Sequence, residues 1–141
     1  MNIDAIQNGI VIDHIEAGKG MEIYRLLGLG DLDCQVAIIK NAVSRKMGRK
    51  DIIKIAADIP VNIDILGYVD PGVTVDVICD GKLVEKKKAE LPEKLTNVIF
   101  CRNPRCITTT EQELPHVFRL ADREKREYRC LYCEAKSEKP V

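Results

Sequence analysis

The sequence has little that would direct this 141-residue chain to a membrane or to a polyanion. Lysine plus arginine and aspartate plus glutamate both number 22, so no overall field favours nucleic acid or an anionic surface. No stretch approaches about 18 consecutive apolar residues, and the first residues, MNIDAIQNG, are not a charged segment followed by an apolar one. We therefore expect a soluble, cytoplasmic protein with no membrane or nucleic-acid partner.

The motifs of common enzymes are also absent. The chain contains neither G-x-x-x-x-G-K-[ST] nor G-x-G-x-x-G, and no Ser/His/Asp set or carboxylate pair at a useful spacing. Asp13 and His14 are adjacent, and neighbouring residues of a strand point to opposite faces, so we expect no joint acid–base role. Cys34 and Cys79 are expected to be small core residues without an activating base, and His116, after a proline, to be exposed. These absences favour a binding protein over an enzyme.

Four cysteines near the C-terminus form two short pairs, here called hooks. The hooks have the spacings C-x4-C and C-x2-C and are separated by 23 residues; they are Cys101, Cys106, Cys130 and Cys133. Two thiolate pairs brought in by tight turns are typical of a structural Zn²⁺ site with no open position for water or substrate, and Asn103-Pro104 supplies turn residues in the first hook. Disulfides or unrelated core cysteines are the alternatives, but nothing else in the sequence indicates secretion.

The region that carries the hooks is close to neutral. Residues 98–141 hold 9 basic and 7 acidic side chains, and a Zn²⁺ ion with four thiolates adds about two negative charges. Nucleic-acid-binding zinc modules are usually basic, which weighs against the main rival hypothesis, a zinc-ribbon nucleic-acid-binding protein. Steeply salt-dependent binding to generic DNA or RNA would support that rival.

Periodicity and turn residues predict an α+β fold. Gly9 indicates a bulge or a close backbone approach, and in a regular strand Val11, Asp13 and Ile15 would share one face, with Ile12 and His14 on the other. We expect a buried strand over 35–40 and a hairpin around Asp80-Gly81. The full set is strands over 3–15, 35–40, 50–56, 73–79 and 82–91, a polar connection over 41–49, and helices over 21–29 and 60–69. This β-α-β-β-α-β order with one extra strand is the ferredoxin-like pattern, an antiparallel sheet with two helices on one face.

The remainder of the chain is expected to form a second, smaller domain. Residues 92–97 contain a proline and no periodicity, so we predict a linker there, between domains at 1–91 and 98–141. Short strands are predicted over 98–100, 117–120 and 127–129. This domain, a small all-β zinc-ribbon-like module, is too small to fold without its metal.

One face of the first domain could bind a phosphorylated ligand. Strand periodicity puts Lys50, Ile52 and Lys54 on one face, so that two cations flank an apolar side chain. Asp76 and Ile78 share a face of the next hairpin, and residues 86–88 bring further lysines. From spacing alone, a merely solvated lysine face is the other interpretation.

The chain resembles the regulatory chain of aspartate carbamoyltransferase over nearly its whole length. The resemblance is carried by residues 9–15 (GIVIDHI), 47–55 (MGRKDIIKI), 91–93 (LPE), 97–99 (NVI) and the two hooks. It implies a non-catalytic regulatory subunit of pyrimidine biosynthesis, with an N-terminal allosteric domain and a C-terminal zinc domain that grips the catalytic chain. It also implies regulatory dimers that bridge two catalytic trimers, and nucleoside triphosphate effectors (CTP, ATP and UTP).

Site residues follow from the same resemblance. One structural Zn²⁺ per chain would be held by the four cysteines. The implied nucleotide contacts are Ile6, Val11, Asp13, His14, Lys50, Ile52, Lys54, Ile78 and Lys86, with the three lysines at ribose and phosphates and Asp13 at the sugar. Asp76, which shares a face with Ile78, is a tenth predicted contact. Where this chain has Asp76, the family often has Asn. A carboxylate that faced the base would accept from the amino group of adenine or cytosine but could not donate to uracil, although Asp76 could instead point to water or to a lysine.

Overall fold

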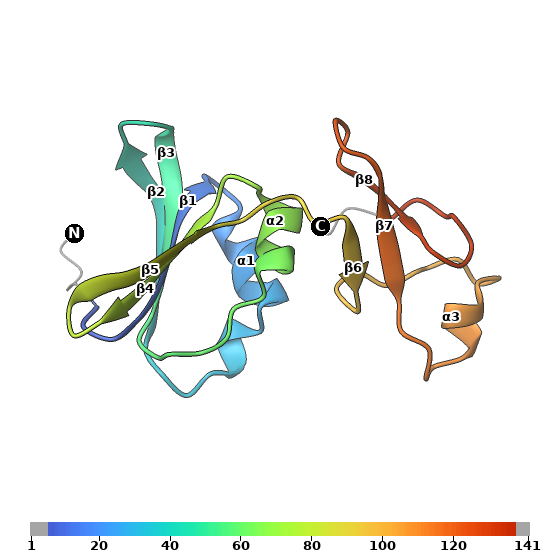
Figure 1. Ribbon diagram of the computed structural model, residues 1–141, viewed down its shortest axis with the longest axis horizontal. Helices are drawn as coiled ribbons and strands as arrows, with labels where there is room; N and C mark the ends of the chain where they lie inside the picture. Colours follow the sequence, from blue (N-terminus) through green and yellow to red (C-terminus); the bar gives the residue numbers. More distant parts are fainter. Residues whose placement is uncertain (1–5, 138–141) are drawn as a thin grey trace. The chain divides into compact units, whose positions relative to one another are not determined.

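The computed structural model describes residues 6–137 of the chain, which divides between Glu90 and Leu91 into two compact units. Each unit has its own antiparallel sheet, with five strands in the first and three in the second (Figure 1). None of the helices within residues 6–137 is long and apolar enough to cross a membrane.

The first unit has the predicted β-α-β-β-α-β order followed by one more strand. Its sheet has the strand order β2-β3-β1-β4-β5, and all of its strand pairs are antiparallel. The elements are β1 (Gly9–Glu16), α1 (Gly20–Leu26), the 3-10 turn η1 (Leu29–Asp31), β2 (Val36–Ser44), β3 (Gly48–Ile55), α2 (Ile63–Val69), β4 (Thr74–Cys79) and β5 (Lys82–Lys88). The ferredoxin-like expectation is therefore confirmed.

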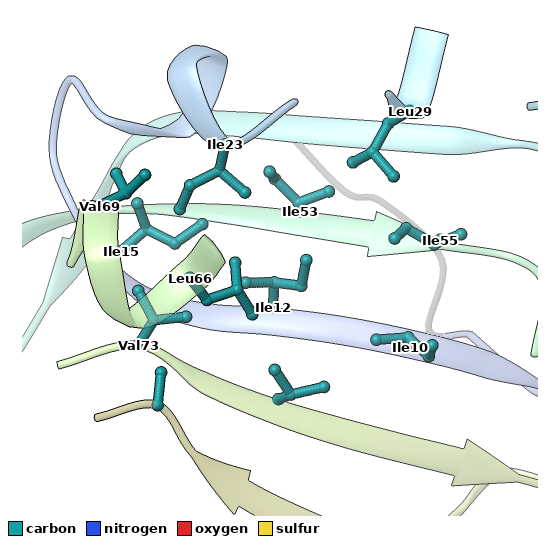
Figure 2. Close-up of a cluster of buried hydrophobic side chains, with 12 residues drawn as sticks. Ile10, Ile12, Ile15, Ile23, Leu29, Ile53, Ile55, Leu66, Val69 and Val73 are labelled. Atoms are coloured by element: carbon teal, nitrogen blue, oxygen red, sulfur yellow. The ribbon is translucent and has the colours of Figure 1, made fainter. Parts of the chain in front are cut away.

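The core of this unit lies between the two helices and one face of the sheet. Figure 2 shows Ile23 of α1 and Leu66 of α2 over the isoleucines of β1 and β3. Burying apolar side chains of this size contributes about 1.5–3 kcal/mol each. The buried set is Ile10, Ile12, Ile15, Ile23, Leu29, Ile53, Ile55, Leu66, Val69, Val73, Val75 and Ala89. The opposite face of the sheet is not covered by these helices and is called the open face.

A bulge in β1 overturns the predicted face of two residues. His14 has a φ of 60°, and the pairing of β1 with β3 shifts between Ile12 and Ile15. The extra residue returns Ile15 to the core, where it is fully buried, instead of leaving it on the face of Asp13. His14 stays on the open face, because its Nδ1 lies 2.9 Å from the hydroxyl of Thr74, which is opposite Asp13. The regular alternation that we predicted beyond Asp13 was wrong.

Gly9 marks a close backbone approach rather than the bulge. A Cβ atom at this position would lie 2.0 Å from the carbonyl oxygen of Ile55 on the neighbouring strand, and the φ of Gly9 is +150°. The Asp80-Gly81 turn is confirmed: both residues have positive φ, as a two-residue hairpin turn requires.

Several element boundaries differ from the predictions. The polar connection expected over 41–49 is mostly strand, because β2 continues to Ser44 and β3 begins at Gly48. As an edge strand, β2 is half-buried rather than buried. The helix expected from Pro60 begins at Ile63, because the side chain of Asn62 accepts from two backbone N–H groups and caps it.

A buried carboxylate ties α1 and β2 to the sheet. Asp51 of β3 is fully buried on the core side. One of its oxygens accepts from the backbone N–H groups of Gly18 and Gly20, at 3.1 and 2.9 Å, and the other accepts from Asn41 at 2.8 Å. Three backbone donors satisfy the carboxylate without a cation, which makes its burial tolerable.

The second unit is a three-stranded sheet with the order β6-β7-β8 and one short helix. Its elements are β6 (Lys94–Thr96), α3 (Ile107–Thr110), β7 (Val117–Asp122) and β8 (Glu127–Cys130). Residues 92–97, predicted as a linker, contain β6, whose Leu95 is buried, and the strand predicted over 98–100 is absent. The helix α3 was not predicted, because four residues are too few for a periodic pattern.

We predict that Gly67→Ala destabilises the first unit. Alanine at a helix interior normally stabilises by about 1 kcal/mol over glycine. At this position, however, a Cβ atom would lie 1.8 Å from the carbonyl oxygen of Glu90. We expect a loss of about 2 kcal/mol or more in urea unfolding followed by circular dichroism. Gly72→Ala, whose nearest neighbour would be 3.4 Å away, is the matched control and should be close to neutral. Stabilisation by Gly67→Ala would contradict the packing described here.

Candidate functional site

The open face collects nearly all of the predicted nucleotide contacts. Directly paired residues of antiparallel strands share a face, and Val11 is paired with Lys54 on one side and Asp76 on the other. Asp76 is in turn paired with Lys86. One row therefore runs from Lys54 to Lys86 across four strands, a span of about 14 Å at the usual strand spacing.

Apolar and cationic side chains alternate around this row. Ile52 shares the face of Lys54 on β3, and Ile78 shares that of Asp76 on β4; each is half-buried. Lys88, which is paired with Thr74, adds a further ammonium group to the open face. Nine of the ten predicted contacts lie here, namely Val11, Asp13, His14, Lys50, Ile52, Lys54, Asp76, Ile78 and Lys86. Their role as contacts stays a prediction.

The tenth residue, Ile6, precedes β1 and is not paired in the sheet. The chain that follows it is held at the hairpin turn, since Gln7 accepts from the backbone N–H of Gly81 at 2.8 Å. The side chain of Asn8 accepts from the N–H of Asp80 at 3.1 Å.

The bulge brings three titratable groups together on the open face. Lys50 Nζ lies 2.9 Å from Asp13 Oδ1, and His14 Nδ1 lies 4.0 Å from Asp13 Oδ2. Burial raises the pKa of Asp13, but the hydrogen bonds from Lys50 and from the backbone N–H of His14 outweigh it, so the pKa is held below its usual value. Asp13 is therefore ionised at neutral pH, and Lys50 is held in place before any ligand binds.

Asp76 has an unusual environment. Within residues 6–137, its Oδ1 is the single buried side-chain oxygen or nitrogen without a hydrogen-bond partner. A buried acceptor left unpaired costs about 1–3 kcal/mol. Because neighbouring atoms bury this oxygen, a ligand would have to displace them before it could donate a hydrogen bond to it.

In the second unit, the four cysteines of the hooks converge. Their sulfur atoms all lie within 4.8 Å of one another, and none is in a disulfide. The sulfur atoms of Cys101 and Cys133 are 3.6 Å apart, and those of Cys106 and Cys130 are 3.7 Å apart. Four sulfurs at about 2.3 Å from one tetrahedral ion would be about 3.8 Å apart, so the residues fit a four-thiolate metal site.

Turns and hydrogen bonds set the conformation of the first hook. Asn103 accepts from the backbone N–H of Arg105 through its side chain and from that of Cys106 through its carbonyl, each at 3.0 Å, as its turn chemistry predicted. Burial raises the pKa of Cys101 to about 12. Burial also acts to raise the pKa of Cys106, but hydrogen bonds from the side chain and backbone of Thr108 outweigh it and lower the pKa to about 7.

Sequence reasoning missed three residues that support these sites. His116 is not simply exposed: its Nδ1 accepts from the backbone N–H of Cys101 at 3.1 Å, and its ring meets Phe100 edge-on. Thr108 contacts a cysteine sulfur, and Thr74 holds His14. Thr108, two residues after a cysteine, could have been suspected, whereas the pairs formed by Thr74 and His116 depend on strand register and loop path. Cys79, expected in the core, is exposed at the end of β4.

A ferredoxin-like unit with an uncovered polar face, next in the chain to a unit with a four-cysteine cluster, defines the class of two-domain proteins that carry a metal-binding module. Comparison with known families agrees. The family description "Aspartate carbamoyltransferase regulatory chain, allosteric domain" matches residues 1–90, and "Aspartate carbamoyltransferase regulatory chain, metal binding domain" matches residues 93–140. The chain belongs to the family of aspartate carbamoyltransferase regulatory chains.

Individual relatives support the same conclusion. The chain is 51% identical over 134 residues to the aspartate carbamoyltransferase regulatory chain of Clostridium botulinum, covering 95% of this chain and 92% of the relative. The regulatory chains of Clostridium tetani (49% over 135 residues, 95% and 94% covered) and Bifidobacterium longum (46% over 134 residues, 95% and 96% covered) are similar. These relatives are named regulatory chains, which confirms the expectation that this chain is regulatory rather than catalytic.

We predict that Asp13→Asn lowers stability at neutral pH and that its effect shrinks in acid. The pKa of Asp13 is lower in the folded protein than in the unfolded chain, so its ionised form stabilises the fold at pH values above the unfolded pKa. This contribution is lost as the pH falls through the lowered pKa. Urea unfolding of both proteins between about pH 6 and about pH 3 should show the two stabilities converging. A difference that stays constant over this range would contradict the role of the ionised Asp13.

Proposed function

We propose that this chain binds nucleoside triphosphates, CTP and ATP and with them UTP, on the open face of its first unit and so controls the catalytic chains of aspartate carbamoyltransferase. The observation that carries this proposal is the convergence of nine predicted contacts on one sheet face. Lys50, Lys54 and Lys86 offer point charges to phosphates, while Val11 and Ile52 offer an apolar surface to a base. Asp13, ionised and pointing to the same face, would accept from the ribose.

The second unit completes the proposal. Its four sulfurs would hold one Zn²⁺ ion, which is the structural ion most suited to four thiolates in a closed tetrahedral site. The unit would grip the catalytic chain, and regulatory dimers would bridge two catalytic trimers. A cytoplasmic location and a role in the synthesis of pyrimidines belong to the same proposal.

Lys86→Ala should weaken CTP binding by about 1–3 kcal/mol, the scale of a lost charge-assisted hydrogen bond. Isothermal titration calorimetry measures this loss, and metal content and assembly should not change. Lys87→Ala is the matched control. Lys87 is paired with Val75, which is buried in the core, so Lys87 is not on the open face. The Nζ atom of Lys87 lies 3.4 Å from Oε1 of Glu85. Equal losses in the two variants would exclude the open face as the binding surface.

Removal of the metal should unfold the second unit and leave the first unit largely folded. The second unit is too small to be stable without the free energy of metal binding. A mercurial or a chelator should therefore reduce the circular dichroism of this unit and release the catalytic chain in size-exclusion chromatography. A complex that stays assembled after complete metal loss would show that the folded second unit is not what binds the catalytic chain.

Asp76→Asn should reduce the preference for CTP over UTP. The unpaired Oδ1 of Asp76 can accept from the amino group of cytosine, but it places acceptor against acceptor at the carbonyl of uracil. An amide, in contrast, can donate as well as accept. Titration of both nucleotides into the wild type and the variant gives the affinity ratio. If the ratio does not change, Asp76 does not face the base.

A further inference from the structure

One hydroxyl group of α3 is turned toward the cysteine cluster. Thr108 is 2% exposed, and its Oγ1 lies 3.1 Å from the sulfur of Cys106. The two threonines that follow it behave differently. Thr109 donates to the carbonyl oxygens of Asn103 and Cys106, at 3.0 and 2.7 Å, and Thr110 donates to that of Ile107 at 3.1 Å. Bonding to a preceding carbonyl is the usual choice of a helical threonine, so the contact of Thr108 with sulfur is a departure that needs a reason.

The chemistry of a metal-bound cysteine supplies this reason. A thiolate has no proton to give, so a hydroxyl beside it must be the donor. Four thiolates around one divalent ion carry a net charge of about −2, and in this unit three of the four cysteines are buried. A donor that points at one sulfur disperses this charge where water does not reach, and it fixes the direction of the sulfur lone pairs.

We propose that Thr108 is a positioning residue of the metal centre, whose hydroxyl donates to the Cys106 thiolate, orients this ligand and slows loss of the metal. The proposal rests on the four-cysteine metal site proposed above. Residues in this outer position commonly change metal affinity by about 10–100-fold when they are mutated.

The test uses the full-length chain loaded with Co²⁺, which reports its thiolate ligands by charge-transfer absorption. Thr108→Val keeps the shape of the side chain and removes the hydroxyl. We expect its charge-transfer band to move to lower energy, because the sulfur loses a hydrogen bond and becomes a better electron donor. Transfer of the metal to a chelator should be about 10-fold faster than in the wild type. Thr110→Val is the matched control, since it removes an exposed hydroxyl from the same helix without touching a sulfur.

Two further variants separate the hydroxyl from packing. Thr108→Ser keeps the hydroxyl and loses the methyl group, so it should match the wild type in both measurements. If Thr108→Val does not take up metal, Thr108→Ala replaces it in the comparison with Thr108→Ser. The proposal requires the alanine variant to release the metal faster than the serine variant.

Either of two results would overturn the proposal: a Thr108→Val or Thr108→Ala protein that matches the wild type in band position and release rate, or a Thr108→Ser protein as impaired as the variant without a hydroxyl. Failure of the underlying metal site is distinguishable. In that case the wild-type chain itself would show no tetrahedral thiolate spectrum with Co²⁺.

Discussion

One extra residue in β1 determines which side chains the first unit presents on its open face. If the strand were regular beyond Asp13, Ile15 would leave the core and His14 would enter it. The left-handed conformation of His14, held by the hydroxyl of Thr74, restores Ile15 to the core and keeps two consecutive polar side chains on the open face. Lys50 then reaches Asp13, and a charged cluster forms beside the apolar surface of the sheet.

The two units are stabilised by different means. The first has an apolar core between two helices and a sheet, reinforced by Asp51, whose carboxylate fastens the start of α1 and the edge strand β2. The second has a three-stranded sheet and few large buried side chains, among them Phe118 and Tyr128, so its stability depends on the cysteine cluster.

The polar groups of the open face differ in whether their hydrogen-bonding capacity is already used in the folded chain. Lys50 and Asp13 are paired with each other, whereas one oxygen of Asp76 has no partner. The pair is already satisfied, so a ligand that uses it gains orientation rather than a new ion pair. Asp76 leaves an acceptor buried and unpaired, so a ligand that donates to it relieves a cost already present in the folded chain. Under the proposed function, discrimination among ligands is expected at the unpaired atom, because a group that cannot donate leaves this cost in place.

The sequence by itself determined the order of the elements, the Asp80-Gly81 hairpin, the alternation of Lys50, Ile52 and Lys54, and the spacing of the cysteines, because each depends on neighbours within a few residues. It did not determine the bulge at His14, the strand β6 within the expected linker, or the contact of His116 with the backbone of Cys101. Those depend on pairing between segments distant in the chain: β1 shifts its register only because Ile15 must fill the core, and β6 forms only because β7 offers it a partner. Tertiary packing decided these features, because burial of apolar side chains contributes more free energy to these segments than their weak local propensities do.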